Sequence, residues 1–119
     1  MPLSSRSSKP ELSSSAQSFQ VVIYLSKNSP AFPELEMRSC EQYAHAFNWD
    51  VSLTVLDDDT ETPPERRSSL QAALQRVKDQ RAGAILVASK ATISPIDGEY
   101  DEFARQVEKA GGFLQVTRR

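Results

Sequence analysis

The stretch Phe19-Gln20-Val21-Val22-Ile23-Tyr24-Leu25-Ser26-Lys27-Asn28-Ser29 decides the fold of this chain. Its centre, residues 21–25, is a run of β-branched, aromatic and aliphatic side chains, and the sequence turns polar at Ser26. Such a run predicts a buried strand that is followed by a polar loop. In an open α/β sheet, binding and catalytic groups gather just outside the carboxyl ends of the strands. A functional site is therefore expected around residues 26–29.

The rest of the chain alternates between helical and strand patterns. We expect helices at about 33–47, 66–80 and 98–110, and further strands at about 49–56, 84–88 and 113–116. Strict alternation of strand and helix predicts a parallel sheet with right-handed crossovers. The expected fold class is α/β, a three-layer α/β/α arrangement with a mainly parallel sheet of four or more strands.

Apolar spacing predicts which side chains face the core. In the first helix, these are Leu35, Met37, Cys40, Tyr43, Ala44 and Phe47, and in the strand at 49–56 they are Val51, Leu53 and Val55. Asn48 is expected to end the first helix, and Gly111-Gly112 forms a C-cap for the last one.

Composition sets the domain organisation and limits the possible partners. Residues 1–18 contain eight serines and little to bury, which predicts a disordered Ser-rich tail. Residues 19–119 are then a single α/β domain. The chain has a net charge of −2, and a DNA backbone is gripped by clustered Lys and Arg, so strong DNA binding by this chain alone is not expected.

Cofactor and membrane signals are weak. The single cysteine, Cys40, excludes an internal disulfide and fits the cytoplasm. No apolar run approaches the ~20 residues that span a bilayer, so no membrane contact is expected. No cofactor is expected either, because the first strand-helix turn lacks a glycine-rich phosphate loop. No metal is expected, since His45 has no second His, Cys or cluster of carboxylates in helical register. The acidic run 57–59 together with Glu61 could hold a divalent cation through oxygen ligands, but a solvated loop is the commoner meaning of such a run.

Several short motifs occur in a recognisable order. They are Ile23-Tyr24-Leu25; Tyr43-Ala44 before Asn48-Trp49-Asp50-Val51; Asp58 with Arg67 and Leu70; Gly83 to Val87; and Ala110-Gly111-Gly112. From about residue 21 to 117 this order resembles the catalytic domain of serine recombinases, the resolvase/invertase family. The resemblance implies a resolvase-like fold and a serine hydroxyl that attacks a DNA phosphodiester while arginines hold the phosphate.

The same resemblance implies that the catalytic residues are mostly lost. The family pattern of tyrosine, any residue, arginine, any residue, serine is Tyr24-Leu25-Ser26-Lys27-Asn28 here. Other family positions fall near Glu36, near Glu61 and Thr62, and near Ala91, Thr92 and Pro95. Only Asp58 and Arg67 remain. The expected degenerate site is therefore Ser26, Asn28, Asp58, Arg67 and Thr92, without a confident catalytic residue.

Three functions stay open at this point. The first is a catalytically silent domain that acts through a protein partner or self-association, as an accessory or regulator, and binds DNA weakly or only through a partner. The second is a weakly active or partner-complemented recombinase fragment, with Ser26 or Ser29 as a displaced nucleophile. The third is a flavodoxin-like domain that binds a small ligand.

Overall fold

The computed structural model describes residues 19–27, 32–59 and 61–118. The elements in chain order are β1 (Gln20–Ser26), α1 (Pro33–Ala46), β2 (Asp50–Asp57), the short 3-10 helix η2 (Pro64–Arg66), α2 (Ser68–Lys78), β3 (Ala84–Val87), the 3-10 helix η3 (Lys90–Thr92), α3 (Asp97–Lys109) and β4 (Phe113–Val116). The predicted tail, residues 1–18, and the predicted site residue Asn28 lie outside the described residues. Within those residues, no helix combines the length and apolar character needed to cross a membrane.

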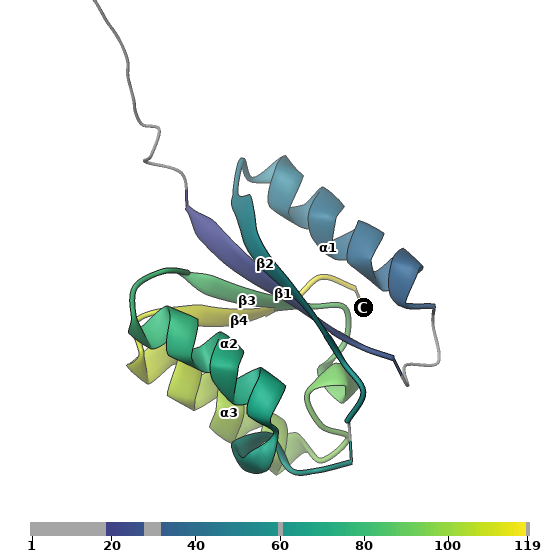
Figure 1. Cartoon of the computed structure of the whole chain (residues 1–119), viewed down its shortest axis with the longest axis vertical. Coiled ribbons are helices and arrows are strands. Elements are labelled where there is room, and N and C mark those ends of the chain that lie inside the picture. The colour runs from purple at the N-terminus through teal and green to yellow at the C-terminus, as the bar shows by residue number, and fades with distance from the viewer. Residues whose placement is uncertain (1–18, 28–31, 60, 119) are drawn as a thin grey trace, which may run out of the picture.

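The four strands form one parallel sheet in the order β2-β1-β3-β4. Helix α1 covers one face, and α2 and α3 cover the other (Figure 1). The predicted three-layer α/β/α fold with a parallel sheet is confirmed. The chain steps outward from β1 to β2 and then returns to β3 on the opposite side of β1. Crevices for ligands form at such a reversal, at the carboxyl ends of the strands.

The central strands are buried on both faces, as a parallel sheet between helices requires. In β1, Val21, Ile23 and Leu25 pack against the α1 side, while Val22 and Tyr24 pack against the α2 and α3 side. The core on the α1 side also contains Cys40, Ala44, Ala84 and Leu86, and the other core contains Leu70, Ala73, Leu74, Val77, Ile85, Val87, Ile93, Phe103 and Val107. Tyr24 therefore brings a hydroxyl group into a largely apolar layer.

Helix α2 is shorter than predicted. A helix was expected over about 66–80, but the backbone is helical only from Ser68 to Lys78. Arg67 breaks the helix at its start with an extended conformation (φ −90°, ψ 103°), and this turns its side chain into the protein. The helix ends before Gln80, which has a φ of 62°.

Three apolar side chains that were predicted to face inward are exposed. Helix α1 meets the sheet through the narrow strip Glu36, Cys40 and Ala44, so Leu35 and Phe47 lie outside it, with exposed fractions of 51% and 54%. In β2, Val21 pairs with Val51 but Val22 pairs with Leu53, so the register skips Ser52. This irregularity leaves Val51 38% exposed. Regular alternation begins only at Leu53.

The predicted helix ends are confirmed at two positions. Asn48 follows α1 with a φ of 60°, and Gly111 follows α3 with a φ of 100°, a conformation that glycine adopts without a steric penalty. A Cβ atom on Gly112 would lie 2.7 Å from the carbonyl oxygen of Gly83. The absence of a side chain there allows β4 to begin beside β3.

Candidate functional site

A buried polar network lies at the carboxyl edge of the sheet, on the side of α2 and α3. The hydroxyl of Tyr24 donates a hydrogen bond to Oδ2 of Asp57. The two side chains meet because β1 and β2 pair Ser26 with Asp57, so Tyr24 lies two residues back on the same face of the sheet. The second carboxylate oxygen of Asp57 accepts the backbone N–H of Asp59 at 3.0 Å.

Arg67 closes this network from the start of α2. Arg67 is only 2% exposed. Nε and Nη2 donate to the carbonyl of Thr62 at 3.1 and 2.8 Å, and Nη1 donates to the carbonyl of Thr92 at 3.2 Å. The guanidinium thus ties the loop after β2 to η3. A buried charge is tolerated only when it is well paired and hydrogen-bonded, and Arg67 meets that condition.

The environment keeps the Tyr24 hydroxyl protonated. Burial raises the pKa of Tyr24, and the hydrogen bond to Asp57 raises it further, while Arg67 opposes both effects. A phenol with a raised pKa keeps its proton at neutral pH, so it is a hydrogen-bond donor and a poor acid. Tyr24 therefore orients the carboxylate of Asp57.

Three of the predicted site residues come together. Arg67 bonds to the backbone of Thr92, and η3, which contains Thr92, contacts β1, which ends at Ser26. The hydroxyl groups of Thr92 and Ser89 lie 3.3 Å apart. Ser26 and Thr92 are both buried. Ser26, Arg67 and Thr92 therefore belong to one region at the carboxyl edge.

Asp58 does not join them. Its side chain is 76% exposed and forms an ion pair with Nζ of Lys27 at 3.0 Å. The aspartate that reaches the network is Asp57. The alternation Leu53, Val55, Asp57 was the sequence signal that could have identified it, because these residues share one face of β2. Tyr24 was missed as a polar group because it sits inside an apolar run.

Two lysines at this edge are engaged with their neighbours. Lys27 pairs with Asp58, and Lys90 lies 3.9 Å from a carboxylate oxygen of Asp97 and 4.9 Å from the centre of the Tyr100 ring. Among the described residues, no group of three His, Cys, Asp or Glu side chains is arranged to hold a metal ion. The carboxyl edge therefore contains buried hydrogen-bonding groups. Among the residues that the structure describes, it does not contain a cluster of arginines that could bind a phosphate.

This geometry occurs in a fold that is known from solved structures. The chain superimposes on the C-terminal catalytic domain of ISC1926 TnpA, an IS607-like serine recombinase, with a TM-score of 0.70 and 16% identity over 85% of this chain and 71% of that one. The N-terminal catalytic domain of TP901-1 integrase matches with a TM-score of 0.71 and 18% identity, over 82% of this chain and 76% of the other. The fold is that of a serine recombinase catalytic domain. No protein-family model matches the sequence, and no curated protein matches it significantly.

The resemblance inferred from the motifs is thus confirmed at the level of the fold. In this serine-recombinase-like fold, β1 ends at Ser26, and the first helix starts with Pro33. Glu36, on the first turn of α1, is buried. Asn28, which the sequence resemblance places at the nucleophile position, falls in the part between these elements that the structure does not describe.

The α1 side of the same edge contains a buried thiol. The hydroxyl of Thr117 lies 3.6 Å from Sγ of Cys40 and 3.2 Å from the hydroxyl of Ser39. Burial raises the pKa of Cys40 to about 11, and Glu36 and Glu41 add to the effect. Because the thiolate is the nucleophilic form, this protonated cysteine is a structural residue at neutral pH.

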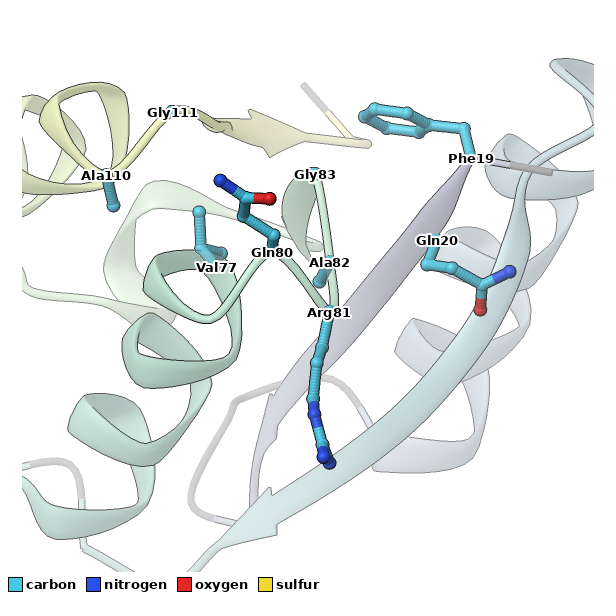
Figure 2. Close-up of a pocket in the computed structure, with 9 residues that line it drawn as sticks. All are labelled: Phe19, Gln20, Val77, Gln80, Arg81, Ala82, Gly83, Ala110 and Gly111. Carbon is cyan, nitrogen blue, oxygen red and sulfur yellow. The ribbon is translucent and has the colours of Figure 1, made fainter. Parts of the chain in front are cut away.

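The opposite end of the sheet has a cavity of about 460 Å³ (Figure 2). It is lined by Phe19, Gln20, Val77, Gln80, Arg81, Ala82, Gly83, Ala110 and Gly111. Phe19 lies against Gly83 so closely that a Cβ atom there would come within 2.2 Å of the ring. A flavodoxin-like ligand site belongs at the carboxyl ends of the strands. A cavity at the amino ends does not favour that third function.

Proposed function

We propose that this chain is a serine-recombinase-like domain that lacks strand-exchange activity and acts through protein contacts, as an accessory or regulator. The observation that carries the proposal is the state of Arg67. It is the one family arginine that the resemblance retains, and Nε, Nη1 and Nη2 all donate to backbone carbonyls. Its role here is structural.

Phosphoryl transfer needs fixed donors that point at the phosphate oxygens, where charge develops in the transition state. Planar guanidinium groups suit that task because they bind two oxygens at once. In this chain, positions near the expected arginines hold Ser26 and Thr92, which are neutral and buried. The nucleophile position is Asn28, whose amide has no attacking hydroxyl.

Charge supports the same proposal. DNA affinity grows with the number of phosphates that Lys and Arg neutralise. The chain has 14 Lys and Arg against 16 Asp and Glu, and two lysines at the carboxyl edge, Lys27 and Lys90, are paired with acidic or aromatic neighbours. DNA binding is therefore weak, or depends on a partner.

The test is a search for a covalent link between the protein and DNA. The full chain is incubated with duplex DNA and run on a denaturing gel, beside Ser26→Ala and Ser29→Ala variants. We expect no protein–DNA adduct in any of the three. An adduct with the wild-type chain that disappears in one serine variant would overturn the proposal and identify the displaced nucleophile.

A double variant provides a matched control. Ser26→Arg together with Asn28→Ser restores the family pattern after Tyr24 without touching Arg67. We expect this variant to remain inactive as well, because the positions near Ala91, Thr92 and Pro95 still lack arginines. Adduct formation by the double variant alone would show that two substitutions account for the loss of catalysis.

A further inference from the structure

The strand β2 lies at the rim of the sheet. Along the described residues it pairs with β1 alone, so its other edge presents backbone N–H and C=O groups outward. It is eight residues long, from Asp50 to Asp57, and each of its first seven residues is exposed or half-buried. Such an edge is a template for another strand.

The usual protections of an edge strand are sparse here. Proteins guard such edges with proline, lysine, bulges, inward charges or very short strands. The segment Val51-Ser52-Leu53-Thr54-Val55-Leu56 has no charge, proline or glycine. The register shift affects only Val51 and Ser52, and Asp57 is turned inward to Tyr24. The regular part from Leu53 to Leu56 is therefore open to pairing. The other rim strand, β4, has four residues and is followed closely by Arg118.

Apolar side chains lie along this edge. Val51 is 38% exposed and Leu56 is 47% exposed. A neighbouring strand places its side chains about 4.5–5.5 Å from those directly opposite, and apolar or β-branched pairs stabilise the sheet. Pairing would therefore cover apolar surface as well as satisfy the backbone groups.

The charges at the two ends of β2 select the partner. Asp50 is exposed at the start, and Asp58 and Asp59 follow the end, where Lys27 offsets one of the two. Hydrogen bonds from Thr62 lower the pKa of Asp59, so it stays ionised at neutral pH. A second copy of β2 in antiparallel pairing would bring acidic ends against acidic ends. A partner strand with basic residues at both ends would place them beside these acidic ends whether it pairs with β2 in parallel or antiparallel orientation.

We propose that the outer edge of β2 binds an extended segment of another protein, with about six uncharged β-forming residues between Lys or Arg residues at both ends. The mode is β-augmentation, in which main-chain hydrogen bonds supply affinity and alternate side chains supply specificity. The inference rests on the proposed function, because it gives the protein contact a surface and a class of partner. Of the residues of β2, only the last, Asp57, belongs to the Tyr24–Asp57–Arg67 network, and the regular part from Leu53 to Leu56 lies outside it.

Three synthetic peptides test the proposal on the full chain. One has a Thr-Val-Thr-Val-Thr-Val core between two lysines at each end, the second has the same core between glutamates, and the third is the lysine peptide with a central proline. We expect the lysine peptide to bind and to slow hydrogen exchange at backbone amides of β2. The glutamate peptide should bind about tenfold more weakly or worse, and the proline peptide should not slow exchange.

A pair of variants with equal charge locates the site. Thr54→Lys places a charge on the exposed edge of β2, whereas Ala72→Lys places the same charge on the exposed surface of α2. We expect Thr54→Lys to abolish binding of the lysine peptide and Ala72→Lys to leave it within about twofold. Equal binding by both variants, protection of amides outside β2, or no binding by the wild-type chain would overturn the inference. None of these results depends on the DNA adduct assay, so the two proposals fail separately.

Discussion

The two ends of the sheet are stabilised by different interactions. At the carboxyl end, Tyr24, Asp57 and Arg67 form a buried polar network. At the amino end, five aromatic rings form a connected cluster: Phe19, Tyr43, Phe47, Trp49 and Phe113. The difference indicates that the carboxyl end depends on matched donors, acceptors and charges, while the amino end depends on apolar area and ring packing.

Trp49 is the centre of the amino-end cluster. Its ring centroid lies 4.9 Å from that of Phe47, 5.2 Å from that of Phe19 and 5.9 Å from that of Phe113. Aromatic pairs of this kind contribute about 0.5–1.5 kcal/mol beyond their buried area. Hydrogen bonds to charged groups, as at Arg67, contribute about 1.5–3 kcal/mol each, and their loss leaves buried partners unsatisfied. The largest effects are therefore expected at the carboxyl end.

Removing the buried cation should have the largest effect. Arg67→Ala leaves the carbonyls of Thr62 and Thr92 without this donor and removes the positive charge beside Tyr24. We expect the free energy of unfolding to fall by about 3–5 kcal/mol in urea titrations. The matched control is Arg66→Ala, an exposed neighbour, which should cost less than about 0.5 kcal/mol. Similar costs for the two variants would mean that the network does not stabilise the fold.

Removing the central ring tests the amino end. Trp49→Ala deletes a half-buried ring that contacts four others, and we expect a loss of about 2–3 kcal/mol in the same titration, below the range for a fully buried aromatic. Phe47→Ala, at a more exposed ring that contacts only Tyr43 and Trp49 in the cluster, should cost about 1 kcal/mol. An equal loss in both would show that the cluster is not organised around Trp49.

Alkaline pH should weaken the carboxyl end through Cys40. The pKa of this thiol is raised in the folded state to about 11 from an ordinary value of 9.0, so the folded chain holds a proton that the unfolded chain releases. The contribution is complete below pH 9 and is lost as pH rises toward 11. We expect wild-type stability to fall by on the order of 2 kcal/mol more than that of Cys40→Ala between pH 8 and 11. Tyr24 contributes in the same direction but is present in both proteins, so the difference isolates Cys40. Parallel pH profiles would contradict the expected shift.

Most of the fold was predictable because it follows from repeating patterns. The run from Val21 to Leu25 and the apolar strand from Ala84 to Val87 define strands that must be covered on both faces. The predicted helix bounds and buried positions were wrong where the local backbone departs from the regular helical or strand period. The extended backbone at Arg67 shortens α2, and the register shift at Ser52 exposes Val51.

The site was less predictable because its members are distant in sequence. Asp58 was expected there, yet its neighbour Asp57 meets Tyr24: alternation along β2 marks Asp57 as inward-facing, but only the register between β1 and β2 brings it beside Tyr24. The sequence by itself determined the layered α/β fold and the absence of a serine at the position of Asn28, because local periodicity and residue identity are local properties. Only the tertiary structure decided that Arg67 is bound by carbonyls and that the aromatic residues meet at one end. Those contacts exist only once strands and helices from separate parts of the chain have packed together.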